Sequence, residues 1–188
     1  DHQPQSKSSL AMMLAVVGAG AWGKNIVNTL GAMGKLGAVV DARQELLDQF
    51  KASFPQIKTY TQVDQMLADS SIKAVCIATP APSHFDVASQ VIRAGKHVFV
   101  EKPMTLTLAD AEALCESSKK AGVTLMVGHL LLYQNAIEFI SNYLNAGKLG
   151  KVFSFHQERL NLGRARDAEN ALWSLGVHDL ACLLYLNN

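Results

Sequence analysis

Glu101-Lys102-Pro103 directly follows a short apolar run, and a histidine, His178, stands near the far end of the 188-residue chain. A lysine ammonium stabilises negative charge that develops on oxygen, and histidine exchanges a proton near neutral pH. Pro103 keeps Lys102 out of the helical conformation, and a cis bond before it would fix the lysine's direction. These groups suit the oxidation of a hydroxyl group. On spacing alone, however, Glu101 and Lys102 could equally belong to a solvated loop, and His178 by itself is better explained as a half-buried helix histidine.

A glycine-rich turn from Gly18 to Gly23 fits the pattern G-x-G-x-x-G. The pattern is weak alone, but here it follows an apolar strand, opens a predicted helix and precedes an acid, Asp41, at the end of the next strand. Glycines allow the tight turn, the approach of a pyrophosphate and close helix packing, and the helix N-terminus favours phosphate. The turn therefore predicts a dinucleotide site and not merely a strand-turn-helix. Its expected cofactor contacts are Gly18, Gly20, Ala21, Trp22 and Gly23.

Asp41-Ala42-Arg43 follows the second predicted strand and adds three expected cofactor contacts. A carboxylate at this place accepts hydrogen bonds from the adenosine ribose and repels the 2′-phosphate of NADP. Asp41 therefore favours NAD, with NADP as the weaker candidate. Arg43 could reduce that preference by stacking on adenine or by contacting a phosphate.

A second turn, residues 78–84 (Ala-Thr-Pro-Ala-Pro-Ser-His), follows the fourth predicted strand. It belongs at the carboxyl edge of the sheet, where open α/β folds bind ligands, so Thr79, Pro80 and His84 are candidate cofactor contacts. The prolines are also explained as the end of a strand and the start of a helix capped by Ser83. For His84, a ligand contact and a structural role are equally favoured.

Short apolar strands alternate with amphipathic helices through the first two thirds of the chain. Strands that are apolar throughout are buried on both faces, and the alternation implies crossover connections. We expect an α/β fold, a Rossmann-type doubly wound parallel sheet, over residues 12–127. The expected strands are 14–18, 38–41, 57–60, 72–78, 97–100 and 123–127, and the expected helices are 22–33, 44–53, 63–68, 83–94 and 108–120.

The pattern changes after residue 127. We expect a helix over 135–146, a half-exposed strand over Lys151–Arg159, a polar loop over 161–170 and a helix over 171–185. A strand without a partner is not a stable sheet, so residues 128–188 are interpreted as the incomplete start of an α+β substrate domain. The start of the chain, Asp1–Ser9, is polar and lacks the apolar core of a signal peptide, so residues 1–11 are predicted to be a disordered leader.

The composition is typical of a soluble globular protein, with 49% hydrophobic and 18% charged residues. A net charge of +1 without basic clusters gives no reason to expect nucleic acid or a membrane as a partner. No apolar run approaches the length of a membrane span. Cys76, Cys115 and Cys182 are odd in number and fit no metal site. They are predicted to be buried free thiols of a cytoplasmic protein without bound metal.

Five motifs in this order resemble the Gfo/Idh/MocA family of oxidoreductases. The resemblance covers nearly everything from Met13 to Leu186 and rests on residues 18–23, 78–80 with His84, 101–103, 127–129 (Val-Gly-His) and 175–179 (Leu-Gly-Val-His-Asp). It implies a Rossmann domain, with Glu101 and Lys102 at the cofactor, and a second domain that forms the substrate pocket and often an oligomer interface. It also implies that Lys102 contacts the substrate hydroxyl and that His178 takes its proton as hydride leaves for NAD.

Two departures from the family pattern bear on activity. Many members have Asp four residues before the histidine, where this chain has Ser174, which cannot stabilise an imidazolium as a carboxylate does. An Arg-aromatic pair after the Gly-His motif is replaced by Leu132-Tyr133. Together with Leu172-Trp-Ser174, this resembles the branch acting on UDP-linked N-acetylated sugars. The resulting candidate substrate contacts are His129, Tyr133, Arg159, Trp173 and Ser174. The tyrosine and tryptophan could equally be core residues, and the arginine part of a solvated face.

The sequence thus predicts an NAD-dependent dehydrogenase acting on the CH–OH group of a sugar or nucleotide sugar, assembled as a homo-oligomer through its second domain. Two alternatives stay open. One is NAD-dependent elimination or glycoside cleavage on a sugar. The other is a non-catalytic NAD(H)-binding regulator or inactive paralogue, for which Ser174 is the clue.

Overall fold

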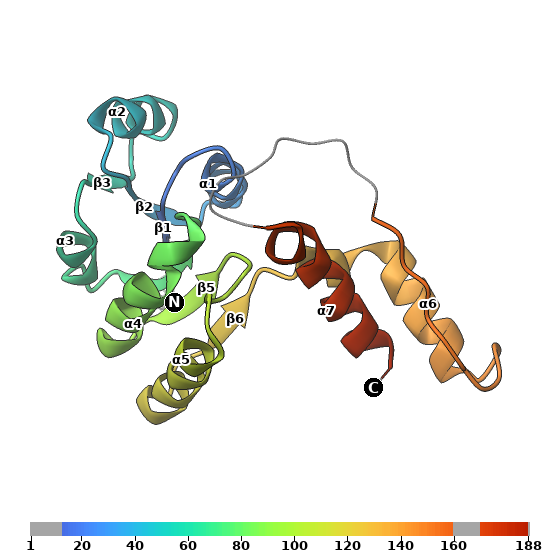
Figure 1. Cartoon of the computed structure of the whole chain (residues 1–188). Helices are drawn as coiled ribbons and strands as arrows, with labels where there is room; N and C mark the ends of the chain where they lie inside the picture. The colour runs from blue at the N-terminus through green and yellow to red at the C-terminus, as the bar shows by residue number, and fades with distance from the viewer. Residues whose placement is uncertain (1–12, 160–169, 188) are drawn as a thin grey trace, which may run out of the picture. The chain divides into compact units, whose positions relative to one another are not determined.

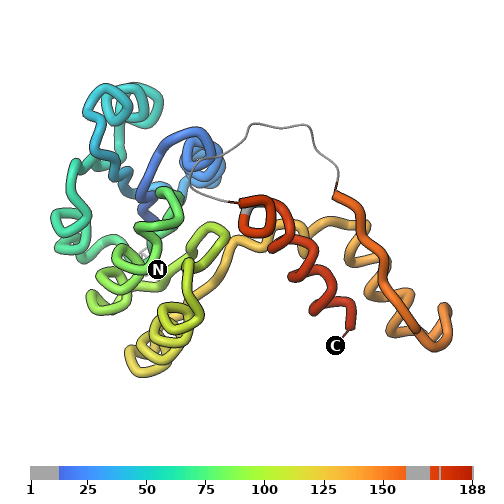
Figure 2. Tube along the Cα trace, in the orientation of Figure 1, coloured from blue at the N-terminus to red at the C-terminus, as the bar shows by residue number. Residues whose placement is uncertain are grey.

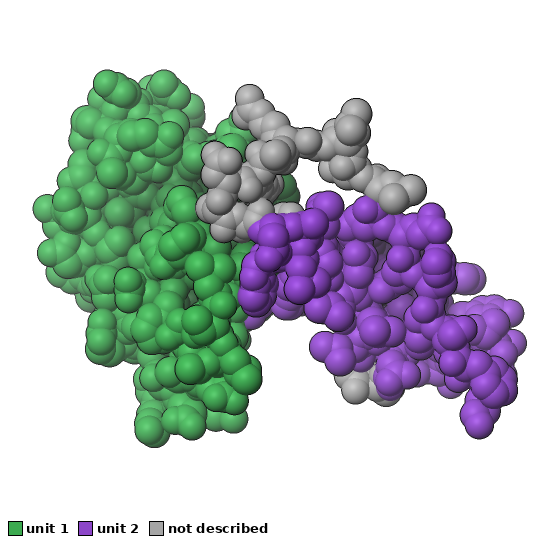
Figure 3. All heavy atoms as spheres, in the orientation of Figure 1, with its two compact units in different colours: residues 1–126 green, residues 127–188 purple. Residues whose placement is uncertain are grey.

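The computed structural model of the protein describes residues 13–159 and 170–187. It divides into two compact units, Asp1–Met126 and Val127–Asn188, which Figure 3 distinguishes by colour.

A six-stranded sheet forms the first unit, in the order β3-β2-β1-β4-β5-β6 (Figure 1). β1 pairs in parallel with both β2 and β4, so the order of the strands reverses there. The carboxyl ends of β1 and β4 therefore form the switch point at which open α/β sheets bind ligands. The strands are β1 Met13–Val17, β2 Leu36–Val40, β3 Lys58–Tyr60, β4 Ile72–Ile77, β5 His97–Val100 and β6 Leu125–Val127.

The connecting helices confirm the predicted alternation, with bounds that differ from the expected ones by a few residues at most. They are α1 Gly23–Ala32, α2 Gln44–Ser53, α3 Val63–Leu67, α4 His84–Arg93 and α5 Leu108–Ala121, with a 3-10 turn, η1 Ala81–Ser83, before α4. The ends of α5 follow the local sequence. Thr107 accepts a hydrogen bond from the Asp110 N–H at 3.2 Å, and Gly122 ends the helix at φ 66°.

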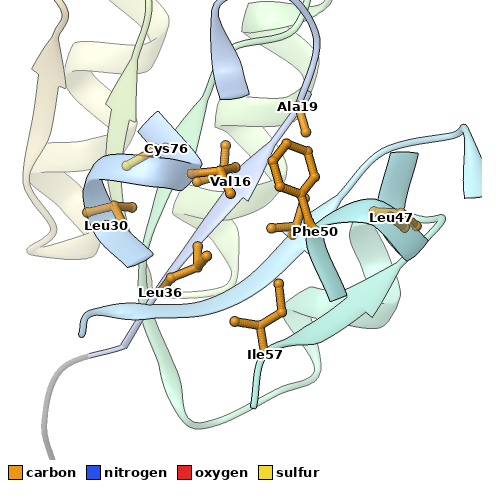
Figure 4. Packing of buried hydrophobic residues seen from close by; sticks show 10 residues of the cluster. Val16, Ala19, Leu30, Leu36, Leu47, Phe50, Ile57 and Cys76 are labelled. Atoms are coloured by element: carbon orange, nitrogen blue, oxygen red, sulfur yellow. The ribbon is translucent and has the colours of Figure 1, made fainter. Parts of the chain in front are cut away.

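Both faces of the central strand β1 are buried. Val16 belongs to a hydrophobic cluster with α1 and α2 that includes Leu30 and Phe50 (Figure 4). Its neighbours Ala15 and Val17 point to the opposite face, because side chains alternate along a strand, and they are buried as well. Helices therefore cover both faces, which is why this strand is apolar throughout.

The second unit contains two helices among its described residues, α6 Asn135–Asn145 and α7 Val177–Leu186, which contact each other (Figure 2). A 3-10 turn, η2 Leu130–Tyr133, precedes α6, and a π-helical turn, η3 Leu172–Gly176, leads into α7. Both predicted helices are thus confirmed. The predicted loop over 161–170 lies outside the described residues except for Asn170.

The prediction of a strand over Lys151–Arg159 is wrong, because this segment has no strand geometry and is almost wholly exposed. Alternation of apolar and polar residues specifies a strand only where another strand supplies hydrogen-bond partners. Among the described residues of this unit, no such strand lies beside it.

The prediction that all three cysteines are buried is wrong for Cys115. This residue is exposed on α5, whereas Cys76 and Cys182 are buried and all three are free thiols. Its neighbour Leu114 faces the core, which turns Cys115 toward solvent. Burial, assisted by the charge of Glu101, raises the pKa of the Cys76 thiol to about 12. Along the parts of the chain that the structure describes, no helix is long and apolar enough to cross a membrane.

These environments predict a reactivity order for the thiols. In the folded chain at pH 8, a thiol reagent is expected to modify Cys115 fully while Cys76 and Cys182 react only after denaturation, because the reactive species is an accessible thiolate. Ellman's assay with and without denaturant measures this order. The Cys115→Ser variant is the control and should lose the fast phase, whereas modification of Cys76 at a similar rate would contradict the burial of β4.

Candidate active site

The glycine turn is shaped by contacts that exclude a side chain at two positions and leave a third open. A Cβ on Gly23 would lie 1.9 Å from the Gly18 carbonyl oxygen, and one on Gly18 would lie 2.7 Å from the backbone nitrogen of Thr79. Gly18 also has φ 84°, which favours glycine. At Gly20, the nearest atom to such a Cβ is Nη2 of Arg43 at 3.6 Å. The turn is therefore closed toward the sheet and open at Gly20, as a backbone surface for a pyrophosphate must be.

Asp41 ties the end of β2 to this turn. Its Oδ2 accepts a hydrogen bond from the Ala19 N–H at 2.9 Å, and Arg43 donates to both carboxylate oxygens at 2.9 Å. The Arg43 guanidinium, helped by the backbone N–H groups of Ala19 and Arg43, holds the pKa of Asp41 below its usual range against the opposing effect of burial. The carboxylate is therefore ionised and correctly aimed before any ligand arrives. Ala42 lies exposed between the two partners.

Trp22 connects the glycine turn with the segment after β5. Its indole Nε1–H donates a hydrogen bond to Oε1 of Glu101 at 2.6 Å. Glu101 is half-buried, and its N–H donates to the Ile77 carbonyl at the end of β4. Sequence reasoning named both residues but missed their contact, and no local signal could have revealed it, because it depends on the order of the strands.

The peptide bond between Lys102 and Pro103 is cis. Lys102 is half-buried at the carboxyl edge of the sheet, directly after Glu101. The ammonium of Lys102 is therefore carried by the same segment that Trp22 anchors to the glycine turn. The backbone of Lys102 thus belongs to the short segment that the Trp22–Glu101 bond joins to the glycine turn.

The turn after β4 lies against the glycine turn through Thr79. Ser83 occupies the N-cap position of α4, as one alternative predicted, but its hydroxyl donates to Oγ1 of Thr79 at 2.8 Å and makes no cap hydrogen bond. Pro80 is exposed. His84 is only 1% exposed, with its two ring nitrogens facing the carbonyl oxygens of Pro103 and Thr79. No ring nitrogen of His84 is left for a cofactor, so we retain this residue in the site without a direct cofactor contact.

In the second unit, His178 is half-buried in the first turn of α7. Next to it, Asp179 forms a two-pronged ion pair with Arg159, with distances of 2.7–3.1 Å. Arg159, a candidate substrate contact, is thus engaged in anchoring its own segment to α7. Asp179 is the partner that sequence reasoning missed.

The other candidate substrate residues differ in their environments. The half-buried His129 precedes η2, and burial lowers its pKa. Tyr133 is 72% exposed, which removes the core alternative for it. Trp173 is half-buried and its backbone N–H donates to the Asn170 side chain, whereas the side chain of Ser174 lies outside the described residues. In the ranges 13–159 and 170–187, no three His, Cys, Asp or Glu side chains gather to hold a metal ion.

The sheet order and the glycine turn define a dinucleotide-binding domain of the Rossmann class. Comparison with known proteins narrows that class. A family model described as an oxidoreductase family with an NAD-binding Rossmann fold matches residues 12–129. The chain therefore belongs to the Gfo/Idh/MocA family.

Individual relatives and solved structures are similar to this chain to different degrees. An uncharacterized oxidoreductase of Schizosaccharomyces pombe is 38% identical over 68% of this chain and 37% of its own length. The UDP-N-acetylglucosamine 3-dehydrogenase of Acidithiobacillus ferrooxidans is 30% identical over 93% of this chain and 54% of its own. The crystal structure of GenD2 from gentamicin A biosynthesis, in complex with NAD, superposes with a TM-score of 0.83. It is 28% identical and is matched over 94% of this chain and 54% of that one. The chain thus spans about half or less of the length of these relatives.

The contrast between two glycines gives a test of the cofactor surface. Gly20→Ala is expected to leave the thermal midpoint nearly unchanged, because its Cβ meets only an ordinary contact, and to weaken NAD(H) binding at least about tenfold, which is about 1.4 kcal/mol. Gly23→Ala should instead destabilise the fold by about 2–3 kcal/mol, because its Cβ overlaps the Gly18 carbonyl. Fluorescence titration and thermal melts of both variants separate the two effects. Unchanged NAD(H) affinity in Gly20→Ala would remove the pyrophosphate from this turn.

Proposed function

We propose that this chain provides the NAD(H)-binding part of a dehydrogenase that oxidises a hydroxyl group of a sugar or nucleotide sugar. The observation that carries the proposal is the Asp41 carboxylate, held at the glycine turn by the Ala19 N–H at 2.9 Å. That bond brings an ionised acceptor for ribose hydroxyls next to a backbone surface suited to a pyrophosphate.

The residues around the turn fit NAD better than NADP. The side chain of Asp41 is 7% exposed and negatively charged, so a 2′-phosphate beside it would be repelled. Arg43 offsets part of that charge, but its own side chain is 60% exposed and free to move aside. In the proposed complex, the ribose hydroxyls replace Arg43 on the carboxylate. The Ala19 bond is kept.

The proposed chemistry is the transfer of a hydride from a carbon that bears a hydroxyl group. NAD supplies the hydride acceptor when it is bound. Lys102 stabilises the negative charge that develops on the substrate oxygen, and His178 accepts the hydroxyl proton. Ser174 stands where many family members have Asp, and a hydroxyl cannot stabilise an imidazolium as a carboxylate does, so we expect slower proton transfer than in relatives with Asp.

The nucleotide-sugar branch is supported by similarity. The relative from Acidithiobacillus ferrooxidans acts, by its name, on UDP-N-acetylglucosamine, and it matches 93% of this chain. His129, Tyr133, Trp173 and Ser174 are the proposed substrate contacts. Arg159 has further guanidinium N–H groups besides those that donate to Asp179. We include it in this set as a hydrogen-bond donor to an anionic group of the substrate. Assembly of two or more copies through the second domain is part of the same proposal.

The cofactor preference has a direct test in this chain. Asp41→Asn is expected to weaken NAD binding about tenfold and to strengthen NADP binding, because it removes a charged acceptor from the ribose and a repulsive charge from the 2′-phosphate. Arg43→Ala is the matched variant, in which NADP binding should fall more than NAD binding. Calorimetric titrations with both cofactors provide the measurement. NADP preferred over NAD by the unmodified chain would contradict the assignment to Asp41.

Turnover tests the catalytic residues, and it is measured on the full natural chain. Lys102→Ala and His178→Asn are each expected to lower kcat by about 10²–10⁴-fold, the range for loss of a positioned catalytic group. NAD affinity should stay within about tenfold in Lys102→Ala, since 1.4 kcal/mol is the most that we expect a lost contact there to cost. Turnover that survives Lys102→Ala rejects its role. The absence of any substrate-dependent NADH signal in the unmodified protein would favour the regulator.

A further inference from the structure

His84 bridges two turns that carry candidate site residues. Its Nδ1 lies 2.7 Å from the Pro103 carbonyl oxygen and its Nε2 lies 2.8 Å from the Thr79 carbonyl oxygen. Carbonyl oxygens only accept hydrogen bonds, so a ring nitrogen that carries a proton donates to the carbonyl that it faces. The side chain is 1% exposed; its contact with the Pro103 carbonyl is buried, and its contact with the Thr79 carbonyl is partly buried.

The two bridged carbonyls belong to different strands. Thr79 follows β4, which ends at Ile77, and Pro103 follows β5, which ends at Val100. Between the strands themselves, the last backbone contact at this edge is the hydrogen bond from the Glu101 N–H to the Ile77 carbonyl. Past this hydrogen bond, the His84 ring connects the two turns, because it contacts the Thr79 carbonyl after β4 and the Pro103 carbonyl after β5.

We propose that His84 is a positioning residue that sets the location of Lys102 relative to the glycine turn. Lys102 is covalently bound to Pro103, so holding the Pro103 carbonyl restrains the lysine backbone. The other contact holds Thr79, whose backbone nitrogen is the atom that a Cβ on Gly18 would meet at 2.7 Å. The ring thereby connects the lysine segment, through Thr79, to the surface at which the cofactor is proposed to bind. This inference rests on the proposed role of Lys102.

The chemistry of the ring favours this role over simple packing. A buried polar group is costly unless its hydrogen bonds are made, so an apolar ring would fill the same volume at lower cost if volume were all that mattered. Both ring nitrogens of His84 instead lie within hydrogen-bond distance of backbone carbonyl oxygens. Phenylalanine in place of the ring would leave these carbonyls without a side-chain N–H donor, whereas glutamine keeps one.

The test compares three variants of the full natural chain. His84→Phe is expected to lower kcat about 10²-fold, because a misplacement of about 1 Å at a reacting group costs that much, with the KM for NAD changed less than threefold. His84→Gln should recover part of the lost kcat because it keeps one donor. The control is His97→Gln on β5, where an exposed histidine accepts a hydrogen bond from the Thr124 N–H at 3.0 Å; kcat should be unchanged.

Thermal melts of all three variants separate positioning from stability. A fall in kcat that is partly restored in His84→Gln, in samples that remain folded at the assay temperature, supports the inference. If Lys102→Ala abolishes turnover and His84→Phe leaves kcat unchanged, the inference is overturned while the proposed function stands. If Lys102→Ala keeps turnover, the proposed function itself fails. If His84→Phe does not fold, the kcat of His84→Gln tests the inference instead. An unchanged kcat in His84→Gln then overturns the inference.

Discussion

The approach of the Gly18 carbonyl to Gly23 is the constraint on which the rest of the first unit depends. The carbonyl oxygen fills the space in which any other residue at position 23 would carry its Cβ, 1.9 Å away. Only this close passage lets α1 begin directly over the end of β1, the strand at which the sheet order reverses. The first turn of α1 carries no acidic residue, so its positive dipole end faces the switch point without an internal counter-charge.

Three side-chain contacts connect the segments that follow the strands at this edge of the sheet. Asp41 binds the Ala19 N–H, Trp22 binds Glu101, and His84 joins the turns after β4 and β5. Each contact joins segments that lie past the ends of the strands, where backbone hydrogen bonds between strands no longer connect them. Loops at a sheet edge are usually the least stable part of a fold, and these contacts restrain them. A site built in this way keeps its polar groups in position at little further entropic cost on binding.

Elements and contacts differ in how far the sequence could predict them. Buried strands such as β4 and capped helices such as α5 were predictable because their signals are local: an apolar run, Thr107 before the helix and Gly122 after it. The bonds of Trp22 and His84 were not, because they join residues brought together only by strand order. The Lys151–Arg159 prediction failed for a related reason, since a strand depends on a partner that its own pattern cannot specify.

The Asp41–Arg43 pair explains how a charged residue can be held ready without blocking its own site. Both oxygens of the carboxylate accept hydrogen bonds, but the backbone N–H of Ala19 holds its position more firmly than the side chain of Arg43 does. The bond to Ala19 joins a nearly buried carboxylate to fixed backbone, whereas the arginine is exposed, and ion pairs of exposed side chains contribute little to stability. An incoming ribose therefore displaces the arginine at small cost while the backbone bond keeps the carboxylate in place. The charge that lowers the pKa of Asp41 is thus also the group most easily exchanged for ligand.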